Sequence, residues 1–288
     1  MKTKSLGRGM EEISHIFLSS EPATVSRKKS QETRKIEKPA ADNSLRMTPS
    51  IGITGSTDRW IGTFALVNIS IELARQGYRV LVIDEDPGPL NVMRSMGLID
   101  VENPGEMILH NAPMGVRIAY RTPFLNDLAL YSRLTRDEKN FSWPERYRRF
   151  DFILSHLPQR NYEDFGPFLR RTSLCIAIGS TEPEGMLQTY AAIKGLNQAA
   201  RQMNFGLIVY DSVGVIPPEE AFIKMARNVR RFLHKDLISY SFIRDDAEIA
   251  ESMETGMPLS LQSPSSEVRR QLFSIAGLII DDYDKKTS

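Results

Sequence analysis

Short apolar runs alternate with longer segments of helical character from residue 48 almost to the end of the chain. The apolar runs predict strands near 50–54, 79–84, 116–120, 150–155, 173–178, 205–210 and 237–242. The helix predictions are 64–76, 183–202, 217–233 and 264–279, followed by a solvated end at 281–286. Connections of this length suit crossover helices, which make successive strands parallel. The pattern predicts a doubly wound α/β fold, with a mainly parallel sheet and helices on both faces.

Length and composition fit one such domain behind a polar tail. The chain has 288 residues, of which 41% are hydrophobic, enough for a single α/β core of about 240 residues. We expect this domain at 48–282. Residues 20–47 have few large apolar side chains and predict a disordered linker, because burial cannot offset the entropy of ordering them.

Residues 1–19 predict a short amphipathic segment before that linker. Met10, Ile13 and Phe17 share one helical stripe. A short amphipathic helix on a flexible tether is a common form of docking peptide, so we expect a protein partner to bind these three side chains. An uninvolved tail is the alternative.

The first strand, loop and helix have the setting of a phosphate-binding P-loop. Residues 51–54 predict the strand, 55–63 the loop and 64–76 the helix. A working P-loop needs a lysine for the β- and γ-phosphates and a hydroxyl for Mg²⁺. No lysine occurs between Lys38 and Lys139, and Asp58 at the loop tip would repel phosphate. The loop therefore predicts a nucleotide site that has lost its chemistry.

The flanking segments resemble a known family. The stretch VNISIELARQGYRVLVIDED at 67–86 resembles the MinD/ParA family of deviant-Walker ATPases, and TEPEGMLQTYAAIKGLN at 181–197 is similar to its FlhG-like branch. The resemblance covers roughly 48–280 and implies a SIMIBI-type P-loop fold. It also implies a remnant of the nucleotide site. The remnant residues are Gly55, Gly62, Thr63, Asp84, Asp86, His156 and Asp211.

Two of these positions depart from the family pattern. His156 stands where the family has its Walker B aspartate, and Asp211 stands where it has an adenine-contacting asparagine. A neutral imidazole cannot replace the carboxylate that organises water around Mg²⁺. Asp84 and Asp86 survive, although a carboxylate at a strand end near a helix start is stabilising whether or not a ligand binds.

These features predict a catalytically degenerate regulatory or adaptor subunit. The resemblance implies a role in the spatial organisation of a bacterial cell-surface machine such as a flagellum, a pilus or a polysaccharide synthase. We expect no catalytic residue and no cofactor, and we expect a homodimer or a pairing with an active MinD/ParA paralogue. One alternative is a weak ATP-binding ATPase that uses ATP and Mg²⁺. A second alternative is a DNA-associated partitioning protein, although the formal net charge of +1 disfavours DNA as a partner.

The remaining motifs carry less chemistry. Cys175 is the single cysteine and predicts a buried, inert thiol. The four histidines lack metal-ligand spacing, so we expect no metal site. No apolar run reaches the roughly 20 residues that a membrane span needs, and we expect a cytoplasmic protein. Three arginine groups are interpreted as solvated faces, with nucleic acid as the alternative. They lie at 146–149, at 170–171 and at 227–231.

Overall fold

The computed structural model describes most of the chain from residue 48 onward. The described residues are 48–55, 59–84, 88, 91–98, 109–120, 145–157, 162, 166–211, 216–262 and 265–287. The chain divides between Met47 and Thr48. The expected docking segment 1–19 and linker 20–47 lie outside the described residues.

The described strands form one eight-stranded sheet in the order β3-β4-β2-β5-β1-β6-β7-β8. Every neighbouring pair is parallel except β3 and β4, which are antiparallel. The strands are β1 (Ser50–Gly55), β2 (Val80–Asp84), β3 (Leu109–Asn111), β4 (Arg117–Tyr120), β5 (Phe152–His156), β6 (Leu174–Ser180), β7 (Asn204–Asp211) and β8 (Leu237–Arg244). The predicted α/β class with a mainly parallel sheet is confirmed.

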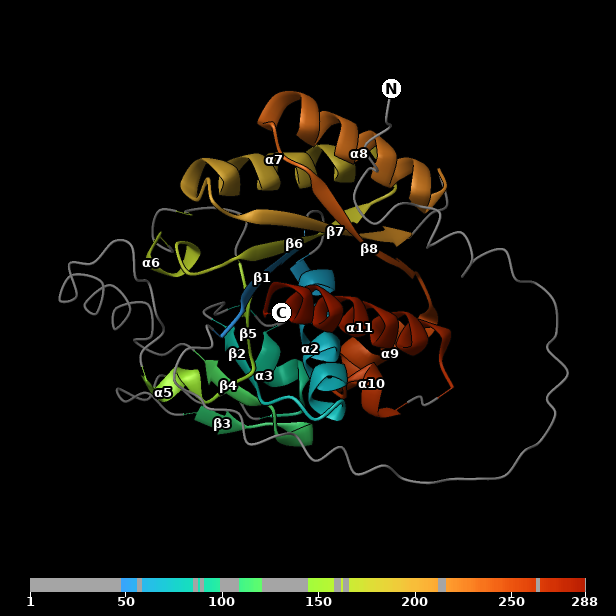
Figure 1. The fold of residues 1–288 in the computed structure, drawn as a ribbon. Helices are drawn as coiled ribbons and strands as arrows, with labels where there is room; N and C mark the ends of the chain where they lie inside the picture. Colours follow the sequence, from blue (N-terminus) through green and yellow to red (C-terminus); the bar gives the residue numbers. More distant parts are fainter. Residues whose placement is uncertain are drawn as a thin grey trace, which may run out of the picture. The chain divides into compact units, whose positions relative to one another are not determined.

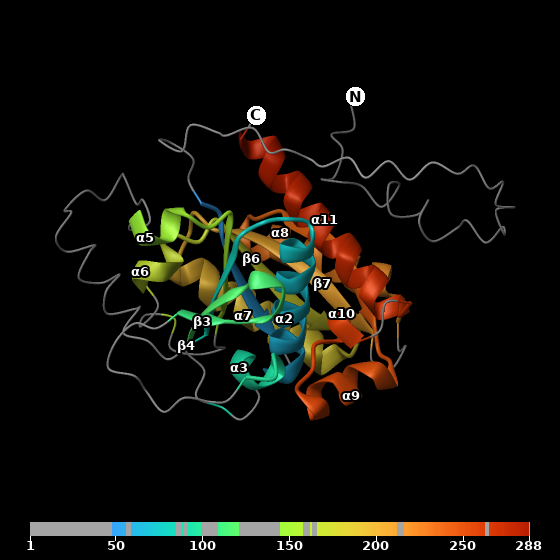
Figure 2. The same ribbon diagram turned by 90° about the horizontal axis from the view of Figure 1, so that it is seen from below.

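Helices cover both faces of this sheet (Figure 1). On one face lie α7 and α8, and on the other lie α2 and α11 with the short helices α9 and α10 beside them (Figure 2). The helices are α2 (Arg59–Arg75), α3 (Val92–Ser95), α5 (Glu145–Arg148), α6 (Gly166–Leu169), α7 (Pro183–Ala199), α8 (Pro218–Leu233), α9 (Ala247–Thr255), α10 (Leu259–Gln262) and α11 (Glu267–Thr287). A 3-10 turn spans Pro113–Gly115.

The two faces of the sheet bury separate apolar cores. Along β5, Phe152 and Leu154 contribute to the core under α2 and α11, whereas Ile153 contributes to the core under α7 and α8. This alternation follows from the two-residue period of a strand. Because both faces are covered, the inner strands are largely apolar, and the boundaries of β5, β6 and β7 could be predicted closely.

The first helix begins earlier than the predicted residue 64. It starts at Arg59, so Gly62 and Thr63 belong to the helix and not to the loop. A Cβ built on Gly62 would lie 2.9 Å from the backbone nitrogen of Gly55, so glycine allows the helix start to pack directly against the end of β1. Residues 61–73 are all buried. A helix buried on every side lacks an amphipathic stripe, which is why the pattern did not locate its start.

The last helix continues through the segment that was predicted to be solvated. That prediction is correct only in part, because three of the five side chains described at 281–285 are exposed, while α11 continues to Thr287 and packs Tyr283 on the domain. The Tyr283 ring lies edge-on against Phe152 with 5.3 Å between centroids. The Tyr240 hydroxyl donates to Asp282 Oδ2 at 2.6 Å. Tyr283 is one turn beyond the buried Ile279 and extends the apolar stripe of the helix.

The edge strand β8 contains a bulge that was not predicted. Its register against β7 shifts between Leu207 and Val209, and Ser241 has a φ of 86°. The extra residue allows Tyr240 and Ile243 both to join the core under α11. A bulge on an exposed edge also opposes pairing with a further strand.

No helix within the described ranges is both long and apolar enough to cross a bilayer.

Candidate functional site

The candidate site lies at the sheet edge where the parallel strands end. Gly55 ends β1, Asp84 ends β2 and His156 ends β5, and these three strands are neighbours in the order β2-β5-β1. The helix α2 starts just beyond β1. Ligands of open α/β sheets bind outside this edge. The structure therefore brings Gly55, Gly62, Asp84 and His156 together, with the buried Thr63 next to Gly62.

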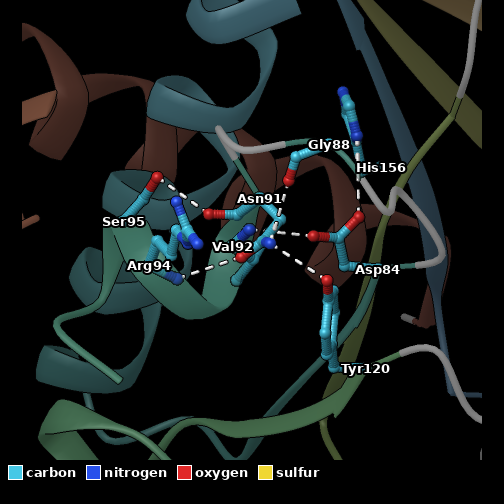
Figure 3. Close-up of polar contacts among 8 residues, drawn as sticks. All are labelled: Asp84, Gly88, Asn91, Val92, Arg94, Ser95, Tyr120 and His156. Atoms are coloured by element: carbon cyan, nitrogen blue, oxygen red, sulfur yellow. Dashed lines mark hydrogen bonds and ion pairs between the residues drawn. The ribbon is translucent and has the colours of Figure 1, made fainter. Parts of the chain in front are cut away.

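His156 fills the space between the end of β2 and the start of α2. Its side chain is only 6% exposed, and Nδ1 lies 3.7 Å from Oδ1 of Asp84 (Figure 3). On the other side of the ring, Nε2 would lie 3.5 Å from a Cβ built on Gly62. The imidazole thus stands against both the surviving carboxylate and the backbone of the helix start.

Asp84 is fully buried and uses its carboxylate to hold the next helix. Its Oδ2 accepts a hydrogen bond from the backbone N–H of Val92 at 2.8 Å, at the first residue of α3. A negative charge there is favourable, because the first N–H groups of a helix have no partner within the helix. Asp84 therefore has a structural use that needs no ligand. Asp86 lies outside the described residues.

Asn91 and Tyr120 complete this network, and neither was singled out from the sequence. Asn91 is the N-cap of α3 and its Oδ1 accepts from the Arg94 N–H at 3.0 Å. Its Nδ2 donates to the Gly88 carbonyl and to the Tyr120 hydroxyl, each at 3.0 Å. Asparagine before a helix is a capping signal that could have identified Asn91. No comparable signal marked Tyr120, which is buried at the end of β4.

Further along the same edge, an aromatic pair lies at the end of β7. Trp60 of α2 meets Tyr210 edge-on, with 5.7 Å between centroids. The Tyr210 hydroxyl donates to Asp245 Oδ1 at 2.5 Å, and the Asp245 N–H donates to the Asp211 carbonyl at 3.0 Å. The site residue Asp211 thus belongs to β7, two strands away from β1.

Five acidic residues lie at or just beyond the described strand ends. Asp84 ends β2, Glu182 follows β6, Asp211 ends β7, and Asp245 and Asp246 follow β8. Arg244 also lies here, over the Phe242 ring. The lysines of the described segments lie elsewhere, within α7, α8 and α11 and just before β8. They are Lys194, Lys224, Lys235, Lys285 and Lys286. This edge therefore offers carboxylates where a nucleotide would bring phosphates.

No group of three or more His, Cys, Asp or Glu side chains in the described part of the chain could hold a metal ion. Cys175 is a free and fully buried thiol in β6, as expected, and burial raises its pKa. Cys175 faces the core under α7 and α8. His156 lies on the opposite face of the sheet, because it is two residues beyond Leu154 in the same strand.

The fold is that of the MinD/ParA ATPases. Solved structures similar to this chain include the septum site-determining protein MinD complexed with Mg-ADP from Pyrococcus horikoshii. It shares 20% identity, covers 81% of this chain and 96% of its own, and gives a TM-score of 0.59. The MinC:MinD cell division protein complex from Aquifex aeolicus gives 17% identity, coverages of 81% and 96%, and a TM-score of 0.59.

A ParA family ATPase from Chlorobium tepidum is similar as well, with 9% identity, coverages of 80% and 98%, and a TM-score of 0.59. No family model matches the chain, and no curated protein matches it by sequence. These likenesses establish the fold, while the chemistry of the site depends on the residues of this chain.

Proposed function

We propose that this chain is a catalytically degenerate MinD/ParA/FlhG-like protein that acts by binding, as a regulatory or adaptor subunit. The observation that carries the proposal is the position of His156, whose imidazole stands between Asp84 and Gly62. In a working site of this fold, the same region must admit phosphate oxygens and a hydrated Mg²⁺.

The residues present do not fit Mg²⁺ and a nucleotide. Magnesium prefers oxygen ligands. His156 stands where the MinD/ParA pattern has an aspartate, so the carboxylate that would organise the water around Mg²⁺ is missing. The P-loop position has no lysine, and the surrounding strand ends carry carboxylates. The carboxylates repel a polyanionic ligand, and the missing lysine removes a positive charge that would attract it.

The network around Asp84 supports a fixed conformation. Where ligand binding selects a conformation, the ligand must interact differently with the two states. In this chain Asp84 and Asn91 hold the start of α3 through protein hydrogen bonds alone. The start of α3 therefore has protein hydrogen-bond partners that do not depend on a nucleotide, which suits a constitutive binding partner.

Partner binding is a use to which this fold is put elsewhere, since the Aquifex aeolicus MinD forms a complex with MinC. We place the present chain in the spatial organisation of a bacterial cell-surface machine of the flagellar, pilus or polysaccharide-synthesis kind. The proposed partner contacts are Met10, Ile13 and Phe17. The proposed assembly is a homodimer or a pair with an active MinD/ParA paralogue, and in the second case the paralogue would supply the nucleotide chemistry.

The decisive experiment measures nucleotide binding and turnover together. We expect millimolar ATP with Mg²⁺ to leave the melting temperature unchanged and to cause no saturable change in Trp60 fluorescence, with Trp60→Phe as the control that assigns the signal. A ligand present at about 100 times its Kd would stabilise the fold by roughly 2.7 kcal/mol. A clear rise in melting temperature, with ATP turnover abolished by Asp84→Ala, would establish the weak ATPase alternative.

A further inference from the structure

Exposed members of the three arginine groups, together with Arg201, lie at the sheet edge opposite the candidate site. Arg148 and Arg149 precede β5, Arg170 precedes β6, Arg201 precedes β7, and Arg230 and Arg231 precede β8. The strands β5, β1, β6, β7 and β8 are consecutive neighbours and run parallel. Residues that precede parallel strands must lie at one edge. We call these six arginines the basic edge.

Hydrogen bonds join the turns that carry the basic edge. Between the turns before β6 and β7, the Asn204 N–H donates to the Ser173 carbonyl at 3.1 Å, and Gln202 Nε2 donates to the Leu169 carbonyl at 3.4 Å. Between the turns before β7 and β8, Lys235 Nζ donates to the Arg201 carbonyl at 2.5 Å. The turns before β6, β7 and β8 are therefore held together by hydrogen bonds, and the arginines they carry follow one another along this edge.

The basic edge is exposed, and carboxylates such as Asp236 and Asp151 interrupt it. All six arginine residues are exposed. Asp236 pairs with Arg230 at 2.5 Å, and Asp151 pairs with the nearby Arg79 through two guanidinium nitrogens. These carboxylates would repel a continuous polyphosphate. The row thus offers separated cationic positions, which match separated carboxylates along a polypeptide better than a phosphate backbone.

An exposed aromatic ring lies within the same surface. Phe232 is 58% exposed at the end of α8, and the Arg231 guanidinium lies 5.1 Å from its ring centroid. An aromatic side chain beside arginine is typical of the residues that contribute most to protein–protein binding. The ring offers an apolar contact that a nucleic-acid backbone cannot use.

Each arginine group also stands at or after the end of a helix, α5, α6, α7 or α8. Cations are favourable there because the last carbonyl groups of a helix carry partial negative charge. This explains why the positions accept arginine. It does not explain why exposed arginines precede four strands of the sheet, or why one of them lies beside the exposed Phe232.

We infer that the basic edge and Phe232 bind an acidic polypeptide segment that carries an apolar side chain. The segment comes from another protein, because residues 1–46 of this chain contain ten basic and six acidic residues and do not complement the surface. The inference gives the proposed adaptor function a second contact, and rests on that function for its biological meaning. Its binding test involves no nucleotide, so ATP binding would contradict the adaptor function without affecting the result at this edge.

The test uses fluorescence anisotropy with the full chain and a labelled peptide of repeated Glu-Asp-Leu-Glu units. We expect Arg201→Ser with Arg231→Ser to weaken binding by roughly tenfold or more at low salt, and Phe232→Ser to weaken it as well. The matched control is Lys194→Ser with Lys224→Ser, which removes the same charge from exposed positions on α7 and α8 and should change binding by less than about twofold. Arg201→Lys with Arg231→Lys should retain binding, and melting temperatures confirm that each variant is folded.

Three outcomes would overturn the inference. The first is equal weakening by the serine pair and by the lysine control, which would indicate a nonspecific effect of net charge. The second is a 20-base-pair DNA duplex that binds more tightly than the peptide and depends on the same arginines. The third is preferential, arginine-dependent binding to phosphatidylserine vesicles. Either of the last two would assign the basic edge to a different class of partner.

Discussion

At the scale of single residues, the contact between His156 and Asp84 makes a measurable prediction. His156→Asp would place a second carboxylate next to a fully buried one, across the present 3.7 Å contact. Two like charges at about 4 Å in a partly buried setting repel by roughly 4 kcal/mol. We expect the variant to lose about 2–4 kcal/mol of unfolding free energy at pH 7, as measured by urea denaturation.

The control for this prediction is His156→Asn, which is close in size to aspartate and uncharged. Repulsion would raise the pKa of the new carboxyl in the folded protein above its unfolded value, so protonation would favour the folded state. The stability gap between the two variants should therefore be largest near pH 7, shrink as the pH falls through the raised pKa, and close near the unfolded aspartate pKa of about 4. Equal stabilities at pH 7 would show that the two side chains do not share one desolvated space. Neither variant should gain ATP turnover, because the lysine is still missing.

Cys175 gives a second prediction at this scale. The thiol is fully buried and burial raises its pKa, so both access and thiolate formation are suppressed in the folded state. We expect a disulfide-exchange reagent to label the folded protein at least about a hundredfold more slowly than the protein unfolded in guanidinium. Rapid labelling of the folded protein would mean that β6 opens easily or that the core under α7 is loosely packed.

At the scale of elements, the end of α11 makes the third prediction. Tyr283 packs edge-on against Phe152, so Tyr283→Ala should remove apolar contacts and an aromatic pair. Such losses correspond to about 2–3 kcal/mol of unfolding free energy for a partly buried ring. Lys285→Ala is the matched control, because its side chain is exposed on the same helix. If the two variants are equally stable in urea, the last turns of α11 do not pack on the sheet in solution.

The elements differ in how far their sequences determined them. Buried parallel strands are continuous apolar runs, and the predictions for β5, β6 and β7 were close to the observed bounds. The start of α2 could not be found in this way, because burial on all sides removes the periodic pattern that marks a helix. The short strand β3 escaped notice because its three residues, Leu109–Asn111, are not fully buried and carry no apolar run.

At the scale of the whole molecule, the sequence showed which site residues differ from the MinD/ParA pattern. It did not show what the retained residues contact. Asp84 could be recognised as a strand-end carboxylate. Its hydrogen bond to Val92 and its contact with His156 depend on strand order, which brings β2, β5 and β1 together from distant parts of the chain. The same order assembles the basic edge from Arg201 and members of three arginine groups that are far apart in the sequence. Topology therefore gives the molecule an acidic edge at the strand ends and a basic edge at the strand starts.

The last prediction concerns the division of the chain between Met47 and Thr48. The domain is anchored from its first described residues, since Thr48 Oγ1 donates to the Phe150 carbonyl at 3.1 Å and the Ile153 N–H donates to the Pro49 carbonyl at 3.0 Å. If residues 1–19 bind a partner protein, these contacts within the domain do not depend on them. Removing residues 1–47 should then change the melting temperature by less than about 2 °C, while abolishing co-purification of any partner bound through Met10, Ile13 and Phe17.

Removing residues 1–50 is the matched control, because it also deletes Thr48, Pro49 and the first residue of β1, and it should lower the melting temperature by roughly 8 °C or more. A comparable loss on removing residues 1–47 alone would show that the N-terminal segment packs on its own domain, and the docking hypothesis would be wrong.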